Sequence, residues 1–476
     1  MPDRPNLLVV VLDTARADHL PPHRTDLAPR LARRAERGLV RDTFRSTAPW
    51  TLPSHASLFC GAYPTEHGVH GRAAIRRDAR VATLRAAVER QEERWLPEAL
   101  RRAGYRTFGV SANPWVSEPM GLAFGFETFV PVGAAKLRPR GAPTGTRRRP
   151  SDRIPTAVRR PLGRAARHWV EWRRGIDAGG ARGVGHARRL IAERAETGGP
   201  FFGFVNLMEA HVPYAPPRAH NELRGMAGLR APAVSRRRRS YERTLAYNLG
   251  RDGLSPQDLE TIRALYRGEI RYLDALLGRL LDDVPANTVV VITADHGEAL
   301  GEHHQLDHQV TMIEEVVRIP LVILGDGPSH ADLTTIRDLT GWLGAAAGLD
   351  PGPWNERRRV PAGVAIAEYE STVAHDRRSV GVARTAGLPP DRLALLEAEM
   401  ATAVEGDRKL LRVASADSLL DAETDEPIAD DPSARARLAG YLADARARPA
   451  PEPSPEGYSE QEEAEVESRL AQLGYL

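Results

Sequence analysis

A hydroxyl-bearing segment near the amino terminus is the first candidate for chemistry in this chain. It reads Pro49-Trp50-Thr51-Leu52-Pro53-Ser54-His55 and follows an unbroken apolar run, 7–12, that leads into Asp13. A rigid, proline-flanked turn would hold a hydroxyl in a fixed position, and an upstream carboxylate can hold a cation beside it. Thr51 is therefore a candidate oxygen nucleophile, because a bound cation lowers the pKa of a hydroxyl that it touches.

A second group of polar residues follows another apolar run. Residues 288–293 lead into Asp295 and His296, which add a carboxylate and an imidazole. In α/β sheets, ligands bind beyond the carboxyl ends of the strands, where Asp13 and Asp295 both fall. Each signal alone also fits a helix cap or a turn with a satisfied histidine. Their conjunction predicts one divalent cation held by Asp13, Asp295, His296 and Thr51.

The elements that must position these residues alternate along the chain. Further apolar runs at 201–207 and 320–324 predict two more buried strands, and helical patterns span 26–37, 95–104 and 256–282. This alternation predicts an α/β fold with a mixed, mostly parallel sheet flanked by helices. Short strand patterns at 368–370 and 408–413, followed by a helical pattern at 430–447, predict a small α+β carboxyl-terminal subdomain.

We accordingly divide the chain into three parts. Residues 1–345 form a catalytic α/β domain, residues 346–447 the α+β subdomain, and residues 448–476 a proline-rich link with an acidic carboxyl-terminal helix. An arginine-rich insertion or flap interrupts the first part at 130–195. That segment, like the basic run 236–239, is either a solvated linker or an electropositive rim that steers an anionic substrate.

Composition narrows the class of protein. The 476 residues are 42% hydrophobic, enough for a sizeable core, and the net charge is +3 with Lys136 and Lys409 as the only lysines. A single cysteine, Cys60, excludes an intrachain disulfide and a thiolate metal cluster. No apolar run approaches the roughly 18 residues of a membrane span, and no cleavable signal is evident. We expect a cytoplasmic protein without a membrane span.

Several motifs together resemble the sulfatase branch of the alkaline phosphatase superfamily. The resemblance covers about residues 5–430 and thins between 130 and 195. It is carried by Asp13, Thr51-Leu52-Pro53-Ser54-His55, Gly61-Ala62-Tyr63-Pro64-Thr65-Glu66-His67-Gly68, Thr293-Ala294-Asp295-His296-Gly297-Glu298, Glu314-Glu315-Val316-Val317-Arg318-Ile319-Pro320-Leu321 and Leu420-Asp421-Ala422-Glu423-Thr424-Asp425. It implies an alkaline-phosphatase-like fold, with Asp13, Thr51, Asp295 and His296 as the ligands of one cation.

The resemblance also implies roles for residues around that cation. His211 would reach the oxyanion of the substrate or protonate the leaving group. His308 would stand near the position of a family lysine that holds the anionic group, and His55 takes the position of an arginine beside the nucleophile. The family's lysine and histidine after a Gly-Tyr-Arg-Thr stretch are absent here, and Asn113 would replace them as a neutral donor that binds substrate.

Two departures from the family pattern limit the chemistry. Sulfatases convert a cysteine or serine in this segment to formylglycine, whereas threonine has a branched β-carbon and cannot give that aldehyde. No formylglycine is expected, and Thr51 would attack as an alkoxide. The two-zinc phosphodiesterases of the superfamily carry an aspartate where this chain has Leu207. We therefore expect one cation, which the oxygen-rich donor set assigns to Mn²⁺, Mg²⁺ or Ca²⁺.

Three functions follow from these observations. The first is metal-dependent hydrolysis or transfer of a phosphate ester or diester through a covalent intermediate on Thr51. The second is cleavage of sulfuric esters without formylglycine. The third is an inactive scaffold whose arginine-rich segment binds nucleic acid or another anionic polymer. Complete retention of the four metal ligands and the lack of regular basic–aromatic interleaving disfavour the third function.

Overall fold

The computed structural model describes residues 4–70, 88, 91–132, 178–237, 241–251, 253–355, 359–371 and 390–447. The described residues leave out most of the arginine-rich insertion. They also leave out all of 448–476, where the sequence predicts a proline-rich link and an acidic helix. Part of the basic run 236–239 lies outside them as well. No helix in the described part of the chain combines the length and the apolar character that a membrane crossing requires.

A seven-stranded sheet forms the centre of the molecule, in the order β2-β9-β6-β1-β5-β3-β4. Strand β9 runs antiparallel to both of its neighbours, and the other pairs are parallel. All residues of β1, β5 and β6 are buried, as expected for strands covered on both faces. The predicted mixed, mostly parallel sheet is confirmed. Its strands are β1 (Asn6–Leu12), β2 (Leu39–Arg41), β3 (Arg106–Ser111), β4 (Thr128–Pro131), β5 (Phe201–Leu207), β6 (Thr288–Thr293) and β9 (Leu321–Leu324).

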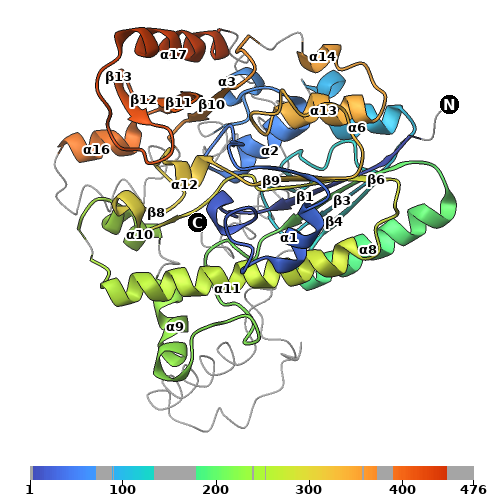
Figure 1. The fold of residues 1–476 in the computed structure, drawn as a ribbon, viewed down its shortest axis with the longest axis horizontal. Helices are drawn as coiled ribbons and strands as arrows, with labels where there is room; N and C mark the ends of the chain where they lie inside the picture. The colour runs from blue at the N-terminus through green and yellow to red at the C-terminus, as the bar shows by residue number, and fades with distance from the viewer. Residues whose placement is uncertain are drawn as a thin grey trace.

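Helices cover both faces of this sheet (Figure 1). One face carries α1 (Pro29–Ala35), α8 (Gly180–Thr197) and α11 (Pro256–Leu281), and the other carries α2 (Thr51–Cys60), α6 (Leu96–Arg102) and α13 (Asp338–Ala346). Helix α11 starts where Ser255 accepts a hydrogen bond from the Asp258 amide, with Pro256 at its first position. The other elements described up to residue 355 are α3 (Pro64–His67), α9 (Gly225–Arg237), α10 (Tyr241–Asn248), α12 (Glu314–Val317), α14 (Gly352–Asn355), η1 (Ala17–His19), η2 (Glu92–Arg94), η5 (Glu302–His304), β7 (Ala299–Leu300) and β8 (Leu306–Asp307).

Helix α2 corrects one expectation, because Thr51 lies in its first turn and not in a proline-flanked turn. Trp50 precedes the helix with extended backbone. Pro53 is accommodated because the first N–H groups of a helix have no intrahelical partner to lose. Gly61 ends the helix with φ +67°, a conformation that favours glycine. Every residue of α2 is buried, including Cys60, so the nucleophile candidate lies at the start of a helix fixed by its surroundings.

The carboxyl-terminal part is an antiparallel sheet covered by a helix (Figure 1). Its strands follow the order β10-β11-β12-β13, and α17 packs on them. The predicted strand at 408–413 and the helix within 430–447 are confirmed, whereas β10 begins several residues earlier than predicted. The elements are β10 (Val364–Tyr369), α16 (Pro390–Glu397), β11 (Met400–Glu405), β12 (Arg408–Val413), β13 (Ala416–Asp421) and α17 (Pro432–Ala445).

A buried lysine joins this subdomain to the large sheet domain. The Lys409 side chain is fully buried, and its ammonium lies 2.9 Å from Glu314, 2.6 Å from Asp425 and 2.7 Å from the Met312 carbonyl. Replacing Lys409 with methionine would leave two carboxylates buried without this partner. We expect the free energy of unfolding to fall by about 3–5 kcal/mol, measured by denaturant unfolding.

The matched control for that variant is Arg412→Ala on the same strand. Arg412 pairs with Asp417 at 2.7 Å, but both side chains are partly exposed. Such pairs contribute under about 1 kcal/mol. Equal destabilisation by the two substitutions would contradict a special role for Lys409.

Candidate active site

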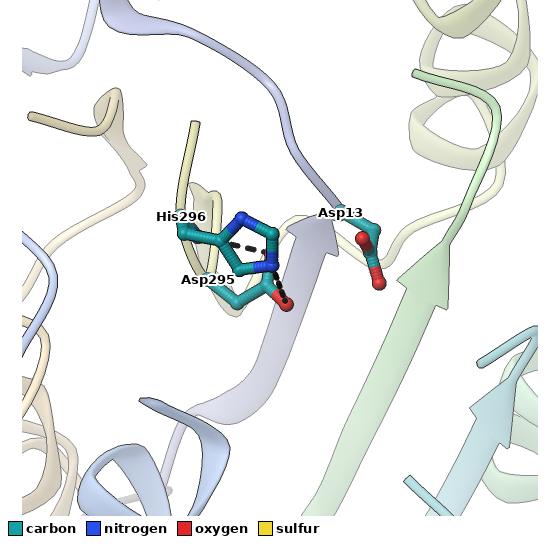
Figure 2. A group of neighbouring side chains, drawn as sticks. All are labelled: Asp13, Asp295 and His296. Carbon is teal, nitrogen blue, oxygen red and sulfur yellow. Dashed lines mark hydrogen bonds and ion pairs between the residues drawn. The ribbon is translucent and has the colours of Figure 1, made fainter. Parts of the chain in front are cut away.

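Two neighbouring strands bring the candidate carboxylates together. Strands β1 and β6 pair in parallel with Val11 opposite Thr293, so Asp13 and Asp295 follow at equivalent places. The Thr14 amide donates to Asp295 Oδ1 at 3.3 Å, and the His296 amide donates to the same oxygen at 3.0 Å. Figure 2 shows Asp13 directly beyond the end of β1, with Asp295 and His296 on the neighbouring turn. The sheet edge predicted from the sequence is therefore where these residues meet.

The carboxylates of Asp13 and Asp295 lack a compensating positive charge that a bound cation would supply. Among the described residues, Asp13 Oδ1 and Asp295 Oδ2 are buried without a hydrogen-bond partner. Burial, followed by the charge of Asp295, raises the pKa of Asp13 to about 7, and burial also raises the pKa of Asp295. Ligand atoms of Asp13, Asp295 and His296 lie within 4.8 Å of one another. Two carboxylates and an imidazole in this arrangement fit one divalent cation.

The Nε2 atom of His296 is available to bind a metal ion. Its Nδ1 donates to the Gly297 carbonyl at 2.9 Å, which leaves the lone pair on Nε2. That nitrogen lies 3.4 Å from Thr51 Oγ1 and 3.5 Å from Asp295 Oδ2. Burial, followed by the neighbouring His308, lowers the pKa of His296 to about 3. The ring is therefore neutral at physiological pH, as metal coordination requires.

Thr51 and Asn113 complete the centre of the site. Thr51 is 2% exposed, and its Oγ1 accepts from Asn113 Nδ2 at 3.3 Å. The same amide donates to Asp13 Oδ2 at 2.6 Å. Asn113 follows β3, so it reaches the site from the same sheet edge as Asp13. The structure thus brings Thr51, Asn113 and the three metal-type ligands together.

His308 and His211 lie beside this centre. The His308 ring centroid is 4.3 Å from that of His296 and 5.4 Å from that of His211. His308 Nδ1 lies 2.8 Å from Asp307 and 3.3 Å from Glu298. Burial lowers the pKa of His308, but these two carboxylates outweigh it and hold the pKa well above its ordinary value. The two carboxylates therefore favour the protonated form of His308 next to the metal-type ligands.

His55 takes a different place from the other candidates. Its Nδ1 donates to the backbone carbonyl of Thr51 at 2.8 Å and lies 3.6 Å from Asp295 Oδ2. The ring packs edge-on against Phe204, with centroids 5.8 Å apart. Burial lowers the pKa of His55, which is fully enclosed. It therefore contacts the backbone of the nucleophile candidate and not its hydroxyl.

Residue-by-residue interpretation of the sequence missed the acidic partners of His308. Glu298 accepts from Tyr214 Oη at 2.9 Å and contacts His308, and Asp307 precedes that histidine directly. Asp307, which directly precedes His308 in the sequence, was the signal that could have identified these partners. His211, which was selected, donates from Nδ1 to the Val212 carbonyl at 2.7 Å and is buried.

Comparison with known proteins agrees with this geometry. The fold, together with the family match given below, places this chain in the alkaline phosphatase superfamily. Solved structures with similar folds include a 2-O GAG sulfatase (TM-score 0.62, 16% identity, 93% of this chain and 91% of that chain). Another is the phosphonate monoester hydrolase of Agrobacterium radiobacter (TM-score 0.58, 20% identity, 94% of this chain and 96% of that chain).

The family follows from the sequence comparison. The chain belongs to the Sulfatase family, whose sequence model matches residues 5–340. Arylsulfatase K of Canis lupus familiaris is 36% identical over 76 residues, which is 15% of this chain and only 14% of that protein. A sulfatase of Formosa agariphila is 23% identical over 350 residues, 68% of this chain and 64% of that protein.

Asn113 offers a graded test of the site. Asn113→Ala removes the donor to both Asp13 and Thr51, and hydrogen bonds to charged groups contribute about 1.5–3 kcal/mol. We expect kcat/KM to fall by roughly 10- to 100-fold. Asn113→Asp keeps an oxygen for the Trp115 amide but places a second carboxylate beside Asp13, so it should lose more activity than the alanine variant. Equal activity of both variants and the parent would contradict this role.

Proposed function

We propose that this protein hydrolyses or transfers a phosphate ester or diester through a covalent phosphothreonine at Thr51. The observation that carries the proposal is the position of Thr51 Oγ1, which lies in the first turn of α2 between His296 Nε2 and the Asn113 amide. The unpartnered oxygens of Asp13 and Asp295 lie in the same buried cluster. We assign the nucleophile to Thr51 and the metal ligands to Asp13, Thr51, Asp295 and His296.

The chemistry divides into two displacements. A divalent cation held by these ligands would lower the pKa of the Thr51 hydroxyl and offset negative charge on the substrate oxygens. The Thr51 hydroxyl loses its proton to solvent, and Oγ forms a bond to phosphorus while the bond from phosphorus to the leaving oxygen breaks. His211 gives a proton to that oxygen. Water or an acceptor alcohol then attacks phosphorus and gives its proton to His211, while the bond to Oγ breaks. Oγ takes a proton from solvent, which restores Thr51.

The surrounding residues support this sequence of steps. The Asn113 amide donates toward Oγ and Asp13, which orients both oxygens. His308, held as a cation by Asp307 and Glu298, offers positive charge to an anionic group of the substrate. His55 fixes the Thr51 backbone through its carbonyl. These residues bind and orient the ester, and the buried site restricts access of bulk water.

Sulfuric ester cleavage is the second candidate. Its specific support is the match to the Sulfatase family and the likeness to structures named as sulfatases. Formylglycine cannot form at Thr51, so this reaction would also require attack by the threonine oxygen. Phosphate ester cleavage is preferred because the sulfatases that this chain resembles act through formylglycine, which Thr51 cannot form, and a phosphonate monoester hydrolase is among the structures of similar fold.

A substrate panel distinguishes the two candidates. The protein, loaded in turn with Mn²⁺, Mg²⁺ and Ca²⁺, would be assayed with aryl phosphate, aryl phosphodiester and aryl sulfate, with Thr51→Ala as background. We expect phosphate or phosphodiester turnover to exceed sulfate turnover by at least tenfold, a difference of about 1.4 kcal/mol in transition-state free energy. Faster turnover of the sulfate would overturn the phosphate assignment in favour of the second candidate.

A further inference from the structure

A set of metal-type ligands separate from the active-site set, and from Glu298, Asp307 and His308 beside it, lies at the junction of the sheet domain and the carboxyl-terminal subdomain. It consists of His303 in η5, Glu315 in α12 and Asp425 in the turn after β13, whose ligand atoms all lie within 4.8 Å of one another. None of the three belongs to the set formed by Asp13, Asp295 and His296. The mixed donor set, one imidazole and two carboxylates, is a combination that divalent transition ions bind.

Glu315 is the member of this cluster that most needs a partner. Its Oε2 is buried, yet it accepts no hydrogen bond from any residue that the structure describes. A buried polar atom without a partner destabilises the folded state. Burial raises the pKa of Glu315; a backbone hydrogen bond and the charge of Arg16 oppose this shift, and the charges of Glu302 and Asp425 add to it. A bound cation would remove this cost.

The ion pairs at this junction engage Glu314 and Asp425 and do not include Glu315. Lys409 lies 2.9 Å from Glu314 and 2.6 Å from Asp425, and Arg45 lies 3.0 Å from Glu314. Two cations thus face three carboxylates when Glu315 is included. The Asp425 carboxylate is already oriented, because its Oδ2 accepts from the Glu314 amide at 2.6 Å.

His303 and a neighbouring cavity leave the cluster accessible to an ion. His303 is exposed, unlike the buried ligands of the active site. Together with Asp425 it lines a cavity of about 250 Å³ between α10, α16 and the strands of the carboxyl-terminal sheet. An ion can therefore reach His303 and Asp425 from solvent through this cavity, which Glu315 does not line, and water can complete its coordination.

We propose that His303, Glu315 and Asp425 form a second divalent-cation site, which fastens the carboxyl-terminal subdomain to the sheet domain. The imidazole favours a first-row transition ion such as Zn²⁺ or Mn²⁺ over Ca²⁺. The site also adjoins the active-site turn, because the Glu315 carbonyl accepts from the Glu298 amide at 3.1 Å. The bound ion thus stabilises α12, which supports the turn that carries Asp295 and His296, and it does not touch the substrate.

Counting tightly bound ions tests this proposal. The full-length protein would be stripped with chelator, incubated with Zn²⁺, desalted, and analysed for zinc per chain. We expect two ions in the parent, one in His303→Ala and one in Glu315→Gln. His304→Ala is the matched control, since His304 is an exposed neighbour outside the cluster, and it should keep two. Two ions retained in both His303→Ala and Glu315→Gln would overturn the second site.

A further variant separates this site from the active site. Asp295→Asn should lose the active-site ion and keep the one at His303, and Asp295→Asn combined with His303→Ala should bind none. A parent that binds a single ion, lost in Asp295→Asn and kept in His303→Ala, would refute the second site and leave the proposed catalytic function intact. As a second readout, added Zn²⁺ should raise the thermal unfolding midpoint of Asp295→Asn, and this rise should disappear in the double variant.

Discussion

Replacing Thr51 with alanine is expected to lower kcat by about 10⁴-fold or more, the scale seen when a hydrolase loses its nucleophile. The substitution removes the only side-chain oxygen that contacts both His296 and Asn113 in the described structure. Asp13, Asp295 and His296 remain, so the cation should still bind. The measurement is steady-state turnover of the best substrate in the panel, with metal content determined on the same sample.

Two controls sharpen that experiment. Thr51→Ser restores a hydroxyl without the methyl group and should recover activity to within about tenfold, with intact mass verifying that the side chain is unmodified. Thr51→Val keeps the branched shape but has no hydroxyl, so it should be as inactive as the alanine variant. Activity of Thr51→Val comparable to that of the parent would rule out attack by Thr51.

The strands around the site could be predicted from the sequence because their apolar runs are unbroken. Residues 7–12, 201–207 and 288–293 lie in β1, β5 and β6, whose residues are all buried. Strand β4 could not be found in the same way, because it is a short edge strand of four partly exposed residues. Its pairing with β3 depends on contacts across the sheet and not on a local pattern.

The part of the candidate site that could be predicted consists of residues whose side chains are typical metal ligands. Asp13, Asp295 and His296 follow buried strands, and the parallel pairing of β1 and β6 places them together. The orientation of His55 could not be predicted, because its contact with the Thr51 carbonyl follows from the helical geometry of 51–60. Proline at position 53 suggested a turn, although it is equally compatible with the first turn of a helix.

The second metal-type cluster shows another limit of sequence interpretation. His303 and Glu315 are close in the sequence, but Asp425 comes from a different part of the chain. Only the packing of the carboxyl-terminal sheet against α12, fixed by Lys409, brings the three side chains together. A convergence of this kind leaves no spacing pattern that a single sequence could reveal.

Replacing Asp13 with asparagine is expected to have opposite effects on catalysis and on the stability of the metal-free protein. The variant loses a metal ligand, so activity should fall by roughly 10³-fold, equivalent to several kcal/mol of transition-state stabilisation. The same change removes a buried charge that faces Asp295. At pH 8 the metal-free variant should therefore be more stable than the metal-free parent, and added Mn²⁺ should stabilise only the parent.

The pH dependence of the metal-free parent follows from the same carboxyl group. Burial raises the pKa of Asp13 from 3.8 to about 7, so the folded state binds a proton that the unfolded state has released. Its contribution to stability is fully present below about pH 4 and is lost as the pH rises to about 7. Thermal unfolding in chelator across this range should show the decline in the parent and a weaker one in Asp13→Asn. If stability declined with pH equally steeply in both proteins, Asp13 would not be the group that titrates. A weaker decline in the variant would show that the uncompensated charge lies on the metal-type ligands.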